Sequence, residues 1–130
     1  MSRKVLIIED YRAIQENFAF MLKAKLAVMG IELLQARNAE EARDHFYAGI
    51  SDFIVISFDA RFPKKEGGDI GFMGVILVRE FVQHAKEGIA LIAASNSTDS
   101  NMELEAAGCN VVCHTKADLP QIILNIVGLC

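Results

Sequence analysis

Three stretches of the chain are almost continuously apolar and lack the polar alternation of a half-exposed strand. They span residues 5–8, 53–58 and 89–94. Strands that are buried on both faces of a sheet have this pattern, so we expect three inner strands. Two weaker stretches, residues 32–36 and 111–113, are typical of strands nearer the sheet edges.

Between these stretches the apolar residues take up helical spacing. The first such segment predicts a helix over about residues 12–28, with Ile14, Phe18, Leu22 and Leu26 on one face. Its other large apolar residues also have helical spacing, so the sequence assigns core packing to Phe18, Phe20, Met21 and Met29.

Capping signals and apolar stripes predict four more helices. Asn38 with Glu41, and Ser100 with Glu103, have the spacing of capping boxes that begin the second and fourth helices. Gly49 and Gly108 stand where those helices would end. Apolar stripes over residues 75–82 and 122–127 predict the third and fifth helices, and the fifth is entered through Pro120.

The order is therefore strand then helix, five times over. This alternation predicts an α/β domain with a parallel sheet covered by helices on both faces. We expect one doubly wound (βα)5 domain over residues 1–130, with the flavodoxin-like strand order 2-1-3-4-5. Ligands of such sheets bind beyond the carboxyl ends of the strands, where the first and third strands meet.

Composition and charge narrow the class of protein. The chain has 130 residues, of which 52% are hydrophobic and 23% charged, so it is too apolar for a disordered chain. The net charge of −4, with no basic run, argues against direct binding of nucleic acid. No apolar stretch is long enough for a signal-peptide core or a membrane span, so we expect a cytoplasmic protein with no membrane partner.

The cysteines do not form a disulfide framework. Cys109, Cys113 and Cys130 are an odd, sparse set, which predicts reduced thiols packed as small hydrophobic side chains. Cys109, Cys113 and His114 lie close in sequence, but no fourth ligand stands at a spacing typical of a zinc site.

Chemistry-bearing residues follow the predicted strands directly. Glu9 and Asp10 follow the first strand and Asp59 the third, while Ser95 follows the fourth and Lys116 the fifth. Carboxylates that meet at one sheet edge repel one another unless a cation offsets them. Mg²⁺ prefers such oxygen ligands, and a lysine suits a phosphoryl oxygen. Any one of these residues could simply be a polar loop residue, but the set together predicts a phosphoryl site.

In this order and spacing, the residues resemble the receiver domain of two-component response regulators over nearly the whole chain. Glu9 and Asp10 resemble the acidic pair of that family. The segment from Asp59 to Pro63 is similar to its phosphoacceptor segment, and Lys116 stands where its lysine stands. Ser95 falls at the position of the switch hydroxyl, although Ala94 is a competing alignment and Ser97 and Thr98 lie nearby.

The resemblance implies a function. Asp59 would accept a phosphoryl group from a histidine kinase or phosphotransfer protein. Mg²⁺ would be held by Glu9 through water, by Asp10 and Asp59, and by the backbone carbonyl of Arg61. Lys116 would hold a phosphoryl oxygen, and Ser95 would bind the phosphoryl group and shift a surface formed by the fourth helix, fifth strand and fifth helix. Such a protein is a phosphoacceptor signalling domain rather than an enzyme, with only self-catalysed phosphotransfer and autodephosphorylation. Its downstream target would be a protein. Whether the protein also forms a homodimer stays open.

Several residues depart from the pattern of the family. Residues 64–74 form a longer, glycine-rich loop, which we expect to be mobile and to act either as a lid or docking element or as a tolerated insertion. Cys113 and His114 occupy the region of the usual switch aromatic, and Ala117 replaces the proline that usually follows the lysine. Arg61 is large and charged and is predicted to screen the phosphoryl group.

These departures keep a second function open. The alternative is a phosphate-independent pseudo-receiver, a protein-interaction module that retains the fold and part of the site. A small flavodoxin-like enzyme or nucleotide-binding protein is disfavoured, because acidic residues rather than a glycine-rich loop follow the first strand.

Overall fold

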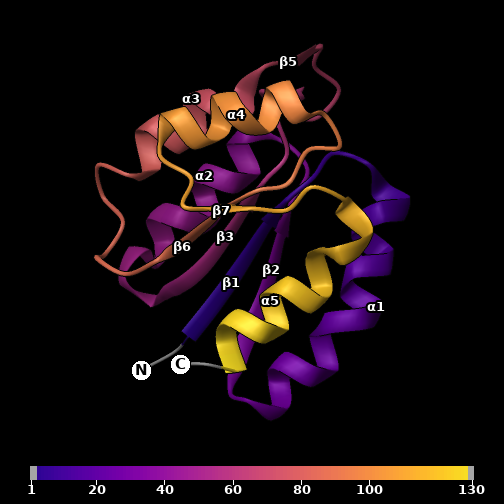
Figure 1. Ribbon diagram of the computed structural model, residues 1–130, viewed down its shortest axis with the longest axis vertical. Helices are drawn as coiled ribbons and strands as arrows, with labels where there is room; N and C mark the ends of the chain where they lie inside the picture. The colour runs from indigo at the N-terminus through magenta and orange to yellow at the C-terminus, as the bar shows by residue number, and fades with distance from the viewer. Residues whose placement is uncertain (1–2, 129–130) are drawn as a thin grey trace.

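The computed structural model describes residues 3–128, which form a central parallel sheet with helices on both faces (Figure 1). Its strand order is β2-β1-β3-β6-β7, so the predicted doubly wound order is confirmed. The strands are β1 (Arg3–Ile8), β2 (Ile31–Ala36), β3 (Phe53–Phe58), β6 (Ala90–Ala93) and β7 (Val111–Val112). The predicted fourth and fifth strands are thus β6 and β7.

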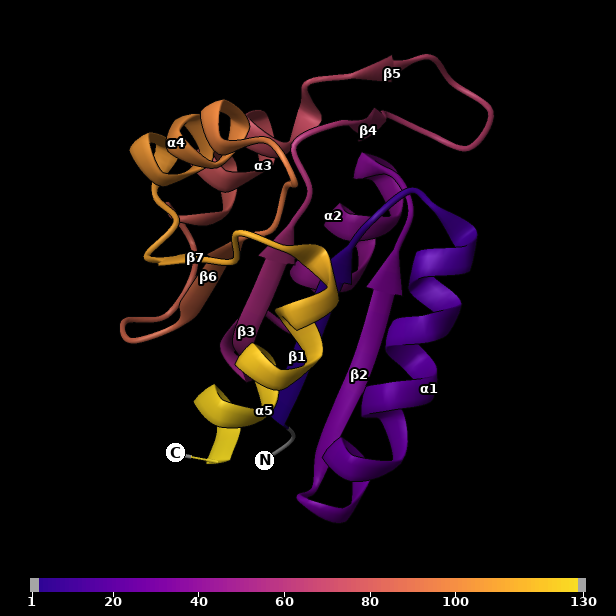
Figure 2. The ribbon, with the colours of Figure 1, turned by 45° about the vertical axis from the view of Figure 1, so that its right-hand side comes forward.

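Within the described part of the chain, five helices cover the sheet, as predicted. They are α1 (Arg12–Val28), α2 (Ala39–Ala48), α3 (Met73–Phe81), α4 (Thr98–Ala107) and α5 (Leu119–Gly128). Short 3₁₀ turns, η1 (Ile50–Asp52) and η2 (Lys116–Asp118), precede β3 and α5. Helices α1 and α5 lie on one face of the sheet, and α2, α3 and α4 lie on the other (Figures 1 and 2). Within residues 3–128, no helix combines the length and the apolar character needed to cross a membrane.

The apolar pattern of the inner strands matches their burial. Val5, Leu6, Ile7 and Ile8 of β1 are all buried, because alternate side chains face the two helical layers. A cluster of stacked rings, with Phe46 and Phe81 at a centroid distance of 4.0 Å, joins α2 and α3 above the sheet. This packing holds the sheet in place, and the sheet in turn positions the loops at its carboxyl edge.

Two predictions for α1 and α4 are wrong in detail. Phe20 is 89% exposed and Met21 is also exposed. Phe20 lies two residues after the buried Phe18, about 200° further around the helix, and therefore faces outward. Helix α4 is capped by Ser97, whose Oγ accepts a hydrogen bond from Ser100 N at 3.2 Å, so the cap stands three residues before the predicted one.

The remaining predicted helix ends are confirmed. Asn38 Oδ1 accepts a hydrogen bond from Glu41 N at 2.8 Å and caps α2. Gly49 ends α2, and Gly108, at a φ of 142°, ends α4. Cys109 and Cys113 are buried free thiols, as predicted, whereas Cys130 lies outside the described residues.

The glycine-rich loop after the third strand contains a small hairpin. Strands β4 (Phe62–Pro63) and β5 (Ile70–Gly71) pair antiparallel and project from the carboxyl edge of the main sheet (Figure 2). The side chain of Phe62 is fully buried, and Lys64 O accepts a hydrogen bond from Glu40 N at 2.9 Å. The base of the loop is therefore anchored in the core and on α2. The mobility predicted for residues 64–74 stays a prediction.

Candidate functional site

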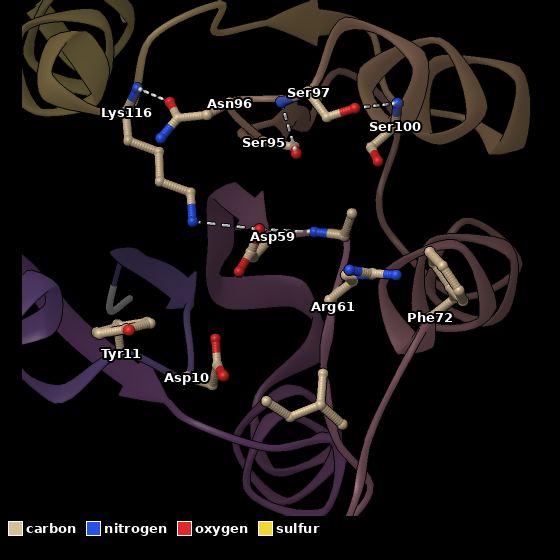
Figure 3. Close-up of a pocket in the computed structure, with 12 residues that line it drawn as sticks. Asp10, Tyr11, Asp59, Arg61, Phe72, Ser95, Asn96, Ser97, Ser100 and Lys116 are labelled. Carbon is tan, nitrogen blue, oxygen red and sulfur yellow. Dashed lines mark hydrogen bonds and ion pairs between the residues drawn. The ribbon is translucent and has the colours of Figure 1, made fainter.

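The loops that follow β1, β3 and β6 and the turn after β7 meet around a pocket of about 680 Å³ (Figure 3). This pocket lies at the carboxyl edge of the sheet, where the topology predicts a ligand site. Its lining includes Asp10, Asp59, Arg61, Phe72, Ser95 and Lys116. The structure thus brings together predicted site residues that lie more than a hundred positions apart in the sequence.

Three carboxylates form the acidic part of the site. Glu9, Asp10 and Asp59 each place one carboxylate oxygen within 4.8 Å of the others. Glu9 is 2% and Asp59 8% exposed, so both charges lie largely out of water. Oxygen ligands of this kind suit a hard divalent cation such as Mg²⁺.

Lys116 bridges two of these carboxylates. Its Nζ lies 2.6 Å from Glu9 Oε1 and 3.3 Å from Asp59 Oδ1. The backbone N–H of Lys116 donates a hydrogen bond to Asn96 Oδ1 at 3.1 Å, which ties the turn after β7 to the loop after β6. A single ammonium therefore faces three carboxylates, and the cluster has excess negative charge.

The ionisation of the site reflects this excess. Burial, together with the charge of Glu9, raises the pKa of Asp59 from 3.8 to about 6. Burial and a hydrogen bond with Glu9 also raise the pKa of Asp10. Burial lowers the pKa of Lys116, but its hydrogen bond to Glu9 and the charge of Asp59 outweigh that effect and raise the pKa overall. A bound cation would relieve the repulsion among the carboxylates.

The backbone around Asp59 is held closely by β1 and α3. Asp59 N donates to Ile8 O at 3.1 Å, and Asp59 Oδ1 accepts from Ala60 N at 2.8 Å. Gly74 N donates to Ala60 O at 3.1 Å, and a Cβ atom on Gly74 would overlap the carbonyl oxygen of Asp59. Only glycine permits the first turn of α3 to lie this close to the segment that follows β3.

Gln15 positions the acidic loop, although the sequence did not predict it as a site residue. Its side chain is buried, and Nε2 lies within 3.1 Å of the carbonyl oxygens of Ile7, Glu9 and Ala36. It therefore joins the ends of β1 and β2 to α1 behind Glu9. A polar residue beside the apolar stripe of α1 was the available signal.

Asn101, on α4, links Ser95 to Cys113, and the sequence did not predict it as a site residue. Asn101 Oδ1 accepts from Ser95 N at 2.9 Å, while its Nδ2 donates to Ser95 O at 2.8 Å and to Cys113 O at 3.4 Å. Ser95 lines the pocket, whereas Ala94 is buried in the core between the sheet, α1 and α5. The switch role of Ser95 stays a prediction.

Arg61 stands on the opposite wall, where its guanidinium carbon lies 4.5 Å from the centre of the Phe72 ring (Figure 3). This cation–π contact joins the segment that follows β3 to the end of the hairpin. The role of the Arg61 backbone carbonyl as a metal ligand stays a prediction. At the usual position of the switch aromatic, Cys113 is buried and its Sγ donates to Thr115 O at 3.0 Å, while His114 is exposed.

Comparison with known proteins gives a structural match but no sequence match. No family model and no curated protein matches the chain. A response regulator receiver domain from Clostridium thermocellum is similar in structure, with a TM-score of 0.70 and 23% identity over 98% of this chain and 95% of that one. A CheY-like receiver domain from Methanospirillum hungatei has a TM-score of 0.69 and 21% identity over 99% of this chain and 93% of that one.

A third similar structure is a chain of the CheX–CheY–BeF3–Mg complex from Borrelia burgdorferi. It has a TM-score of 0.65 and 16% identity, and the match covers 96% of this chain and 89% of that one. At these identities the likeness concerns the fold. The chain therefore has the fold of a CheY-like response regulator receiver domain over nearly its whole length.

Proposed function

We propose that this protein is a receiver domain of two-component signalling that accepts a phosphoryl group on Asp59. The observation that supports this most strongly is the position of the Asp59 carboxylate in an open pocket, 3.3 Å from Lys116 Nζ and grouped with two further carboxylates. The donor is a phosphohistidine of a histidine kinase or phosphotransfer protein. The downstream partner is a protein that reads the surface of α4, β7 and α5.

The donor set fits Mg²⁺. Asp10, Asp59 and the backbone carbonyl of Arg61 would hold it directly, and Glu9 would do so through water. When bound, Mg²⁺ neutralises charge on the carboxylates and on the transferring phosphoryl group. The structural neighbour from Borrelia burgdorferi, a complex with Mg and BeF3, supports this assignment.

In the transfer step a carboxylate oxygen of Asp59 attacks phosphorus as the bond from phosphorus to the donor nitrogen breaks. The electron pair of that bond leaves with the imidazole, which takes up a proton, and an acyl phosphate remains on Asp59. Lys116 Nζ binds a phosphoryl oxygen as its contact with Asp59 Oδ1 loosens. The attacking carboxylate must be ionised, and the raised pKa of about 6 still leaves most Asp59 ionised at neutral pH.

Ser95 and Asn101 supply the path to the partner surface. A phosphoryl group on Asp59 offers oxygen acceptors to the Ser95 hydroxyl, which in this structure accepts from Ser97 N at 3.1 Å. Movement of Ser95 displaces Asn101, because the Asn101 side chain is hydrogen-bonded both to Ser95 N and to Cys113 O, just after β7. The loop after β6, α4 and β7 therefore shift together.

Phosphorylation with a small donor tests the proposal. The protein is incubated with Mg²⁺ and phosphoramidate, and its intact mass is followed with time. We expect one phosphoryl adduct in the wild type and in Asp44→Asn, which changes an exposed acid on α2, and none in Asp59→Asn or in the presence of a chelator. An adduct of equal yield in Asp59→Asn would overturn the proposal.

A second function is favoured by one feature of the site. Cys113, buried and bonded to Thr115, replaces the aromatic that would report the phosphorylated state. If the wild type forms no adduct and binds no Mg²⁺, the protein is a phosphate-independent interaction module with the receiver fold.

A further inference from the structure

The pocket above Asp59 is larger than a phosphoryl group requires. Its volume is about 680 Å³, whereas a water molecule takes about 30 Å³ in the liquid. A phosphoryl group, which is one phosphorus with its oxygens, occupies the space of only a few such molecules. The pocket therefore has room for part of the molecule that delivers the phosphoryl group.

The two sides of the pocket differ in chemistry. Ser97 and Ser100, from the loop after β6 and from α4, give one side a polar surface. The other side carries Arg61 and Phe72, from the acceptor segment and the end of the hairpin (Figure 3). Ile70 of the hairpin also lines the pocket, and we call these three residues the hairpin wall. Ile70 is 62% and Phe72 56% exposed, so the wall presents apolar and aromatic surface to an incoming molecule.

The hairpin that carries this wall is joined to the rest of the fold at both of its ends. Phe62, at the base of the hairpin, is fully buried and pairs with Gly71 of β5. Gly74 N, two residues after Phe72, donates to Ala60 O and so joins the far end of the hairpin to the acceptor segment. The stacking of Arg61 on Phe72 orders the two exposed side chains against each other.

The direction of transfer places the leaving group beside this wall. Phosphoryl transfer proceeds with the attacking and leaving groups roughly in line, so the leaving group lies on the side of phosphorus away from Asp59, toward the pocket mouth. Ile70 and Phe72 both line the pocket and are partly open to solvent, which places them at that mouth.

We propose that the hairpin wall recognises a planar aromatic leaving group and makes the protein selective for imidazole phosphodonors over donors with a small leaving group. This inference rests on the proposed function, because it concerns the same transfer to Asp59. The bond from phosphorus to the imidazole nitrogen breaks with its electron pair on nitrogen, the imidazole takes up a proton, and the bond from Asp59 to phosphorus forms. An imidazole ring can pack against Phe72 and Ile70 as it leaves, whereas ammonia from phosphoramidate has no ring to pack.

The test compares two donors that differ in the leaving group. Initial rates of adduct formation are measured by intact mass with Mg²⁺ and either N-phosphoimidazole or phosphoramidate. For Phe72→Ala we expect the rate with N-phosphoimidazole to fall about five-fold, as for the loss of an aromatic pair, and the rate with phosphoramidate to fall by a clearly smaller factor. For Phe72→Leu, which keeps an apolar side chain, the rate with N-phosphoimidazole should fall by less than for Phe72→Ala. Phe20→Ala, which removes an exposed aromatic side chain (89%) from α1, should change neither rate.

The outcomes separate this inference from the proposed function. Equal losses with both donors, or no loss with either, would overturn the role of the hairpin wall while phosphorylation of Asp59 still stands. If the wild type is phosphorylated by neither donor, the proposed function itself fails. Circular dichroism spectra identical to that of the wild type establish that the Phe72 variants are folded.

Discussion

Replacing Asp59 by asparagine should stabilise the folded protein in the absence of Mg²⁺. Asp59 is buried beside Glu9, and its pKa is raised from 3.8 to about 6. The folded state therefore holds the ionised carboxylate less favourably than the unfolded chain does. An asparagine at this position would keep the shape of the side chain without its charge, and Lys116 would stay paired with Glu9 at 2.6 Å.

The size of the effect follows from the shift in pKa. One pKa unit corresponds to about 1.4 kcal/mol, so a rise of about two units makes the ionised group cost about 3 kcal/mol of folding free energy. Below the unfolded pKa, near pH 4, both states hold the proton and the cost is absent. It grows as the pH rises through the interval between the two pKa values and is fully present above about pH 6.

Urea denaturation followed by circular dichroism, with a chelator present, measures this difference. The free energy of unfolding of Asp59→Asn should exceed that of the wild type by about 3 kcal/mol near neutral pH, and the two should converge near pH 4. Asp44→Asn serves as the matched control, because it removes an exposed acid on α2. Added Mg²⁺ should raise the stability of the wild type more than that of Asp59→Asn. An Asp59→Asn variant that is less stable than the wild type at neutral pH would refute the reasoning.

Three further substitutions test other parts of the site. Gly74→Ala should lower the free energy of unfolding by about 2–4 kcal/mol, because the new methyl group overlaps Asp59 O; thermal melting measures this, and an unchanged Tm would contradict the close approach of α3. Arg61→Ala should shorten the lifetime of the phosphorylated state, because Arg61 screens the phosphoryl group from water; equal dephosphorylation rates in both proteins would dismiss this role. Asn101→Ala should still form the adduct but lose the phosphorylation-dependent NMR shifts of the α4–β7 region, since it removes the hydrogen bonds that link Ser95 to Cys113 O. Retained shifts would show that Asn101 does not couple Ser95 to β7.

The strands and most of the helices could be predicted because their signals are local. The runs over β1, β3 and β6 are apolar on both faces, and only a sheet with two helical layers buries such strands. The alternation of strand and helix then restricts the topology to a few arrangements. The position of residues after each strand predicted which side chains meet, and the structure does bring Glu9, Asp10, Asp59 and Lys116 together.

The errors arise where two local signals compete or where a side chain depends on distant contacts. Ser97 and Ser100 both have side chains that can cap a helix, and the earlier one, Ser97, caps α4. The hairpin over β4 and β5 depends on burial of Phe62 against elements far away in the sequence. The roles of Gln15 and Asn101 consist of hydrogen bonds to backbone groups at the ends of other strands. A polar residue beside an apolar stripe marks Gln15 as unusual, but the local pattern does not say which backbone groups it contacts.

Mapping the position of the phosphoryl group tests the central claim most directly. After incubation with Mg²⁺ and phosphoramidate, borohydride reduction converts an aspartyl phosphate to homoserine, and peptide mass spectrometry locates the altered residue. Conversion of residue 59 alone is the result predicted by a receiver site built on Asp59, Lys116 and the acidic pair. Conversion at Asp10 or at an exposed acid such as Asp44, with residue 59 unchanged, would contradict it.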